Sequence, residues 1–185
     1  MGHAEIMENV VYSVLEDIQI NHIDLSPMEI TERVIEETNM EFAFENWKRG
    51  KWNKIRLRHV INHGQLAIIL SKMCPIKVIK PSMAACGFYD KKIGVYQFDG
   101  HNKGLYDTSK ESLIDLMKLY CPDLSDSLYR ETKAFLRDTL PEVAVCDDKD
   151  LIAYNNGIYD VYHKKFMLFS EDYVFVSKLR EDFVE

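Results

Sequence analysis

The feature that most constrains the fold of this chain is an asparagine and a glycine between two short runs rich in apolar residues. Asn156-Gly157 follows the run 151–154 and precedes the run 158–162. An Asn-Gly pair adopts the positive φ angles of a tight strand connection more readily than other residue pairs do. The pattern therefore predicts a β-hairpin around residue 156, so we expect a fold that contains sheet as well as helix.

The first part of the chain has the periodicity of helices. Apolar residues recur every three or four positions from Ala4 to Ile20, which predicts an amphipathic helix. Ser26-Pro27-Met28-Glu29 has the form of a capping box, so we expect a helix from Ser26 to about Thr38. Further along we interpret residues 39–52 as a loop or short helix, and we expect helices at 53–62 and 65–73 with a bend or break at 62–64.

The second part of the chain mixes short strands with two helices. We expect a strand at 76–79, a hairpin of 88–90 with 94–98 around Lys91-Lys92, a helix capped by Thr108 and Glu111, a second helix at 125–140, and a helix or extended tail at 172–183. These elements predict an α+β fold, mostly helical with short β-hairpins, for which a winged-helix-like arrangement is one option. We divide it into a helical segment, 1–58, and an α+β domain, 59–185.

The bulk composition limits the cellular setting. The chain has 185 residues, and no apolar run approaches the ~20 residues that a membrane span needs. Because the first residues also lack the layout of a secretory signal, we expect a cytoplasmic protein with no membrane partner. The four cysteines are widely separated and form no Cys-x-x-Cys pair, which favours free thiols: Cys74, Cys86, Cys121 and Cys146.

Charge is distributed unevenly along the chain. Residues 1–46 carry eleven acidic side chains and one basic side chain, whereas residues 47–80 carry nine basic side chains and no acidic one. Cations neutralise phosphates, and indole rings stack on unpaired bases. The block therefore predicts a nucleic-acid surface, formed by Trp47, Lys48, Arg49, Lys51, Trp52, Lys54, Arg56 and Arg58. The alternatives are a solvated helix face that pairs with the acidic N-terminal helices, and tryptophans that belong to the core.

The Asn-Gly segment also resembles a known family. Asn156-Gly157-Ile158-Tyr159-Asp160, followed by Phe166-Met167-Leu168-Phe169-Ser170, is similar to the segment that precedes the ring-forming motor in viral, phage and plasmid primase-helicases; Glu171 stands where that family has proline. The resemblance implies a replication domain of a mobile element, acting in a bacterial host or infected cell. It implies structural roles for Asn156, Gly157, Tyr159 and Asp160, with Asp160 accepting hydrogen bonds from backbone N–H groups of the adjacent turn.

Catalysis is not expected of this chain. It has no Gly-x-x-x-x-Gly-Lys-Ser/Thr loop, so we expect no ATP hydrolysis by a P-loop mechanism, no cofactor and no catalytic residue. In the family that it resembles, the superfamily-three helicase motor lies downstream. The resemblance thus implies a domain that guides DNA, single-stranded or forked, towards a motor or packs neighbouring subunits into a ring.

Other readings of the sequence remain open. The chain could serve only in protein interaction and oligomerisation. The loop acids Asp147, Asp148 and Asp150 suit a small metal-dependent nuclease. His59 and His63 have the i, i+4 spacing of metal ligands on a helix, although a third ligand is not evident and Arg56 and Arg58 would repel a cation. We expect no metal at either place.

Overall fold

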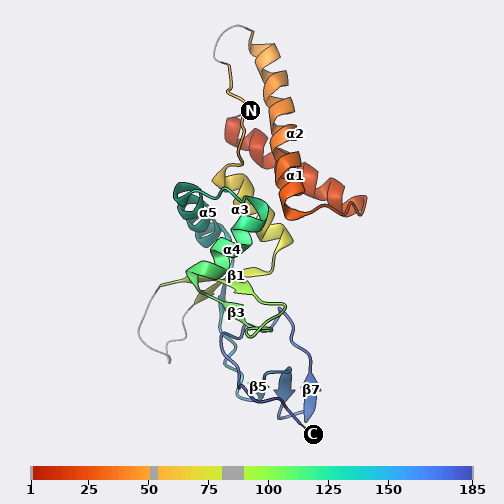
Figure 1. The fold of residues 1–185 in the computed structure, drawn as a ribbon, viewed down its shortest axis with the longest axis vertical. Helices are drawn as coiled ribbons and strands as arrows, with labels where there is room; N and C mark the ends of the chain where they lie inside the picture. The colour runs from red at the N-terminus through yellow and green to blue at the C-terminus, as the bar shows by residue number, and fades with distance from the viewer. Residues whose placement is uncertain (1, 51–53, 81–89, 185) are drawn as a thin grey trace. The chain divides into compact units, whose positions relative to one another are not determined.

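The chain folds into two compact units that each have their own core. The computed structural model describes residues 2–50, 54–80 and 90–184 (Figure 1). The first unit comprises residues 1–73 and 114–135, and the second comprises residues 74–113 and 136–185. The described residues form five helices and seven short strands, which confirms the α+β class. The boundary expected at residues 58/59 falls within the first unit, and the winged-helix-like arrangement stays a prediction.

The first unit is helical. Its helices are α1 (His3–Ile20), α2 (Pro27–Arg49), α3 (His63–Met73) and parts of α4 (Lys110–Tyr120) and α5 (Asp126–Thr139). The predicted first helix is confirmed, because the apolar stripe of α1 is buried: Ile6, Met7, Val10, Val11, Val14, Leu15 and Ile18. α4 begins one residue later than expected, because the Ser109 hydroxyl, not that of Thr108, accepts a hydrogen bond from the backbone N–H of Ser112 at 3.2 Å.

Helix α2 starts where the capping box predicts and continues past the predicted end. The Ser26 backbone N–H donates to the Glu29 carboxylate at 2.8 Å, and the Ser26 hydroxyl accepts from the Glu29 backbone N–H at 3.4 Å. The expectation of a loop or short helix at 39–52 is wrong, since α2 runs on to Arg49. The helix ends at Gly50, whose φ angle of 71° is one that glycine adopts readily.

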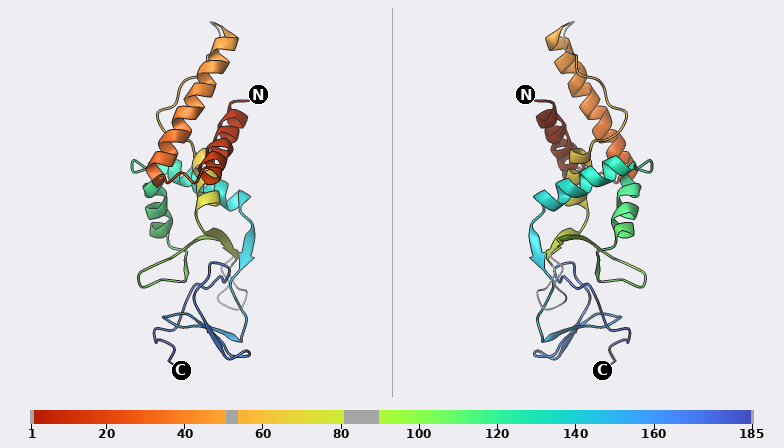
Figure 2. Two further views of the ribbon diagram at one scale, coloured as in Figure 1. Left: turned by 90° about the vertical axis from the view of Figure 1, so that its right-hand side faces the viewer. Right: turned by 90° about the vertical axis from the view of Figure 1, so that its left-hand side faces the viewer.

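The predicted helix over residues 53–62 is also wrong. Residues 54–62 form no helix or strand in the structure, and the chain runs back along α2 (Figure 2). The expected bend at 62–64 is instead the start of α3. The Asn62 side chain accepts from the Gln65 backbone N–H at 2.8 Å, and the Gln65 side chain accepts from the Asn62 backbone N–H at 3.4 Å. This reciprocal pair satisfies two backbone donors, as in a capping box.

A four-stranded sheet lies in the second unit. Its order is β3 (Tyr106–Asp107), β2 (Lys92–Tyr96), β1 (Ile76–Lys80), β4 (Glu142–Ala144). β1 is antiparallel to β2, with Val78 opposite Ile93, and parallel to β4. The expected turn at Lys91-Lys92 is wrong, because Lys92 begins β2, whose partners are β1 and β3. Phe88 and Tyr89 lie outside the described residues.

The Asn-Gly hairpin is present in a second, three-stranded sheet. β5 (Leu151–Ala153), β6 (Ile158–Asp160) and β7 (Lys165–Met167) form an antiparallel meander. The predicted reason for the glycine is wrong, since neither Asn156 nor Gly157 has a positive φ angle. A Cβ on Gly157 would lie 2.5 Å from the Met167 carbonyl oxygen, so close packing against β7 requires a glycine here.

The last described residues follow the sheets without forming a helix. Of the helix or extended tail expected at 172–183, only the second form is compatible with the structure, which shows no helix there. Val174 packs in a core cluster with Ile79, Tyr96 and Tyr106, and Phe175 packs in another with Leu105, Ala153 and Ile158. Across the described residues, no helix is both long enough and apolar enough to cross a membrane.

Candidate nucleic-acid interface

The basic block occupies two neighbouring pieces of chain rather than one helix. Lys48 and Arg49 lie in the last turn of α2, and Lys54, Arg56 and Arg58 lie on the segment 54–58 that returns along this helix. Lys51 and Trp52 lie outside the described residues. The predicted set is therefore divided by the turn at Gly50, and its cations reach solvent from a helix end and from an irregular segment.

Two asparagines of α2 hold the returning segment. The Asn46 side chain donates to the Ile55 carbonyl at 2.8 Å and accepts from the Ile55 N–H at 2.6 Å. The Asn39 side chain repeats this pattern on Arg58, at 2.7 and 2.8 Å. Seven helical residues span about 10.5 Å, and three residues of extended chain span about 10 Å. The two distances match, so the clamps keep residues 55–58 nearly fully extended.

The returning segment, residues 54–58, is called the clamped segment below, and its cations are available to a ligand. Lys54, Arg56 and Arg58 are exposed, and within the described ranges no ion pair reaches any of them. Lys48 and Arg49 differ, because both pair with Glu45, at 2.8 and 3.9 Å. Intramolecular pairing, the alternative reading of the block, thus applies to the helix end and not to the clamped segment.

Two aromatic side chains on α2 face solvent close to Lys48. Trp47 is 77% exposed and Phe44 is 51% exposed, and their rings stack with centroids 6.2 Å apart and an interplanar angle of 13°. The Lys48 ammonium lies 4.1 Å from the Phe44 centroid. The reading of Trp47 as a core residue is therefore wrong. A stacked pair exposed to this extent offers a ring face to an unpaired base.

The helical geometry of α2 places three of its acidic residues away from the clamped segment. At ~100° per residue, the clamping residues Asn39 and Asn46 share one flank, Trp47 lies about 100° from Asn46, and Phe44 lies about 160° from it. Glu37, Glu41 and Glu45 share the other flank, where they line a cavity with α1. These three carboxylates are thus kept away from the clamped cations, whereas Glu32 and Glu36 lie on the flank of Asn39. A hydrogen bond from Lys48 holds the pKa of Glu45 below its usual value. The arrangement favours approach of a polyanion from the cationic flank.

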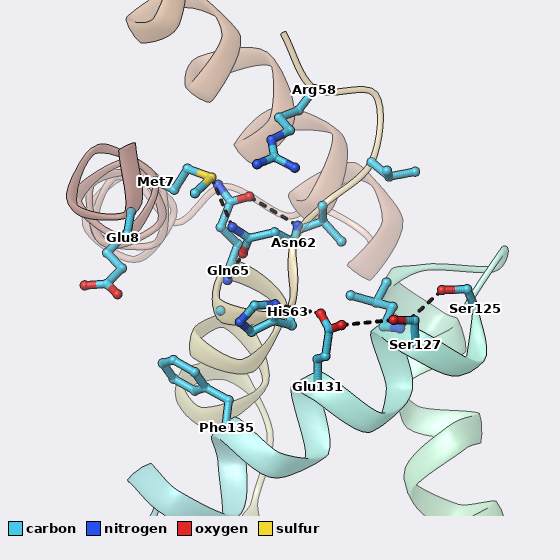
Figure 3. Close-up of a pocket in the computed structure, with 15 residues that line it drawn as sticks. Met7, Glu8, Arg58, Asn62, His63, Gln65, Ser125, Ser127, Glu131 and Phe135 are labelled. Atoms are coloured by element: carbon cyan, nitrogen blue, oxygen red, sulfur yellow. Dashed lines mark hydrogen bonds and ion pairs between the residues drawn. The ribbon is translucent and has the colours of Figure 1, made fainter. Parts of the chain in front are cut away.

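The clamped segment ends at a cavity of about 640 Å³ within the first unit. Arg58 extends over it from the segment, and His63 and Glu131 face each other inside it (Figure 3). The Glu131 carboxylate lies 3.1 Å from His63 Nδ1 and accepts from the Ser127 hydroxyl at 2.9 Å. Because this hydroxyl is bonded to the carboxylate and not to the imidazole, the three side chains lack the order of a hydrolytic triad.

Neither of the two candidate metal positions has the geometry of a metal site. His59 follows the returning segment and lies outside α3, so the helical i, i+4 relation with His63 does not form. Asp148 accepts a hydrogen bond from the Asp150 backbone N–H at 2.9 Å, which is the geometry of a turn. Among the residues that the structure describes, no three His, Cys, Asp or Glu side chains are grouped to hold a metal ion.

The residues of the Asn-Gly motif have structural contacts. Asp160 accepts from the His163 backbone N–H at 2.8 Å and lies 2.7 Å from His163 Nδ1, which confirms the predicted turn contact. These two hydrogen bonds lower the pKa of the Asp160 carboxyl. Asn156 and Tyr159 contact Phe183, which the sequence did not suggest.

Comparison with known proteins does not assign the chain to a family. No protein-family model matches it, and neither does any curated protein. Sequence reasoning had also missed the clamping residues Asn39 and Asn46, for which the available signal was two asparagines seven positions apart. The clamped segment and the exposed aromatic pair are therefore the features that indicate a function.

Proposed function

We propose that this chain is a non-catalytic domain that holds single-stranded nucleic acid. The observation that carries the proposal is the clamped segment, whose cations Lys54, Arg56 and Arg58 are exposed. The stacked pair Phe44–Trp47 is exposed on α2, the helix that holds this segment. Cations contribute binding energy by releasing counterions, and the aromatic face contributes by stacking on a base of any identity. Such a surface binds without reading sequence.

The clamps supply the preorganisation that a flexible basic loop lacks. Fixing the backbone of one residue costs about 1–2 kcal/mol. Because residues 55–58 are already ordered, binding does not have to supply the several kcal/mol that ordering a flexible loop of this length would cost. Ile55 is buried at 7% exposure, which anchors the segment between its charged neighbours. Binding therefore orders only long cationic side chains, while the backbone stays in place.

The resemblance of the Asn-Gly segment supports a more specific setting. We place the domain in a DNA replication protein of a phage or plasmid, ahead of a helicase motor of the superfamily-three type. In that setting the cationic segment guides a single strand towards the motor. The role needs contact and placement rather than bond-making, which agrees with a site made of cations and aromatic rings.

The test compares two triple variants with equal charge change. Changing Lys54, Arg56 and Arg58 to alanine should weaken single-strand binding and reduce the slope of log K against log salt by about 2, at ~0.7 for each lost phosphate contact. The control removes three exposed cations elsewhere: Lys118, Arg137 and Lys149. Fluorescence anisotropy with a labelled oligonucleotide measures both. Equal slopes in the two variants, or no salt-dependent binding by wild type, would refute the proposal.

An assembly role is the second candidate, and a separate observation favours it. Met40 (58% exposed), Phe44 and Trp47 recur at the i, i+4, i+7 spacing with which a helix packs into a partner groove. This role predicts self-association that persists in the Lys54, Arg56 and Arg58 variant and decreases when Met40 is changed to serine. Light scattering distinguishes it from nucleic-acid binding.

A further inference from the structure

The three-stranded sheet binds a short segment of its own chain, residues 181–183, which carries two acidic side chains and a phenylalanine. The Asn156 side chain donates to the Phe183 carbonyl at 3.0 Å and accepts from the Phe183 N–H at 2.8 Å. The Asn155 backbone N–H donates to the Glu181 carbonyl at 3.0 Å, and its side chain donates to the Asp182 carboxylate at 2.9 Å. Main-chain and side-chain groups of the Asn-Gly connection thus form hydrogen bonds with the three consecutive residues 181–183.

An aromatic slot holds the ring of Phe183. Tyr159 stacks on it with centroids 4.3 Å apart and an angle of 18°, Phe166 stacks at 5.4 Å and 10°, and Tyr154 meets it edge-on at 5.4 Å. An additional backbone bond, from the Leu179 N–H to the Ala153 carbonyl at 2.8 Å, aligns the segment with β5. Backbone pairing along a strand combined with a pocket for one side chain is the geometry of peptide recognition by strand addition.

We propose that the connection 154–157 together with Tyr159 and Phe166 is a peptide-recognition site, the Phe183 cradle, and that a second copy of this chain supplies residues 181–183 to it. The cradle takes an extended peptide in which a carboxylate side chain precedes a phenylalanine. In the structure the ligand is the chain's own segment. Exchange of that segment between copies keeps every contact and joins the two copies, because an identical element is swapped.

The chain between the core and the cradle suits such an exchange. Phe175 is anchored in the core, and its carbonyl accepts from the Tyr106 N–H at 2.8 Å. Residues 176 and 177 then cross an exposed stretch before Lys178, whose ammonium bonds the Lys103 carbonyl at 2.9 Å. A hinge at 176–177 frees the segment without disturbing the core. The inference is independent of nucleic-acid binding, since the cradle and the clamped cations share no residue.

The first test asks whether the cradle binds its segment in trans. In wild type the attached segment competes at an effective concentration on the order of mM, so the receptor is the Phe183→Ala chain. A fluorescent peptide of residues 178–184 should bind this variant saturably and wild type at least tenfold more weakly. The doubly substituted chain, Asn156→Ala with Phe183→Ala, should lose binding, as should a peptide with alanine at the phenylalanine. No binding to Phe183→Ala, or equal binding to the double variant, would overturn the proposal.

The second test asks whether a second copy is the occupant. The Phe183→Ala chain has an intact cradle, and the Asn156→Ala chain has an intact segment, so an equimolar mixture should form a complex with one occupied cradle. Energy transfer between donor-labelled and acceptor-labelled chains measures this, and mixtures containing the double variant control for association through other surfaces. Peptide binding without energy transfer above the control would refute copy exchange. Energy transfer that excess peptide abolishes would support it.

Discussion

The asparagine clamp gives a prediction in which no charge is altered. Asn46→Ala removes the two hydrogen bonds to Ile55, at 2.8 and 2.6 Å. At about 1 kcal/mol net for each bond, the clamp contributes about 2 kcal/mol to holding the returning segment. The apparent affinity falls with the fraction of molecules in the binding conformation, and about 2 kcal/mol corresponds to at most ~30-fold. We therefore expect a loss of affinity of up to ~30-fold with an unchanged salt slope.

The assay separates release of the segment from loss of binding. Anisotropy titrations over a range of salt concentrations give affinity and slope, and amide hydrogen exchange at Ile55 and Arg58 reports release. Asn21→Ala is the control, because it removes an exposed amide that bonds Asp17 at 2.6 Å, outside the segment. The reasoning is refuted if exchange at Ile55 accelerates while affinity stays at the wild-type value. A reduced slope would show instead that the clamp itself alters phosphate contacts.

Three further outcomes are expected. Trp47→Ala should weaken oligonucleotide binding by about 1–3 kcal/mol and change thermal stability by less than about 0.5 kcal/mol; a large drop in melting temperature would contradict the exposed position. Gly157→Ala should destabilise by about 1–3 kcal/mol in urea, whereas Gly64→Ala, whose Cβ meets nothing closer than 3.5 Å, should be tolerated. Hydrogen bonds from His163 lower the pKa of Asp160. The contribution of the Asp160 carboxylate to folding stability is therefore complete above the ordinary aspartate pKa of about 3.9, and it is lost as pH falls through the lowered pKa. The stability difference between wild type and Asp160→Asn should therefore narrow between about pH 5 and about pH 2, and a constant difference would contradict the turn contact.

The outcome for the amphipathic helix and the caps shows which signals are local. The stripe of α1 is buried as its periodicity predicts, and the Ser26–Glu29 box starts α2. Both depend on contacts within one turn or on one face, which neighbouring residues encode directly. The strand pairing around Asn156-Gly157 was also predicted, although the glycine is needed for close packing against β7 rather than for its backbone angles.

The clamped segment shows why other elements could not be predicted. Its residues have helix-compatible spacing, yet Asn39 and Asn46 bind its backbone across nineteen and nine residues of sequence. Such long-range hydrogen bonds override local propensity, and a single sequence does not display them. The same holds for the Phe183 cradle, whose two sides lie twenty-seven residues apart.

What the sequence determined by itself was the inventory: an acid-free basic block, one amphipathic helix, a capping box at 26–29, an Asn-Gly strand connection and an α+β composition. Charge and periodicity persist however the chain packs, so they can be read from the residues alone. Only the tertiary structure decided that Lys48 and Arg49 are paired, that Lys54, Arg56 and Arg58 are not paired within the described residues, and that an extended segment presents them. The reason is physical. A cation is available to a ligand only if folding brings no carboxylate close to its side chain, and it is held in place only if folding brings hydrogen-bonding groups close to its backbone.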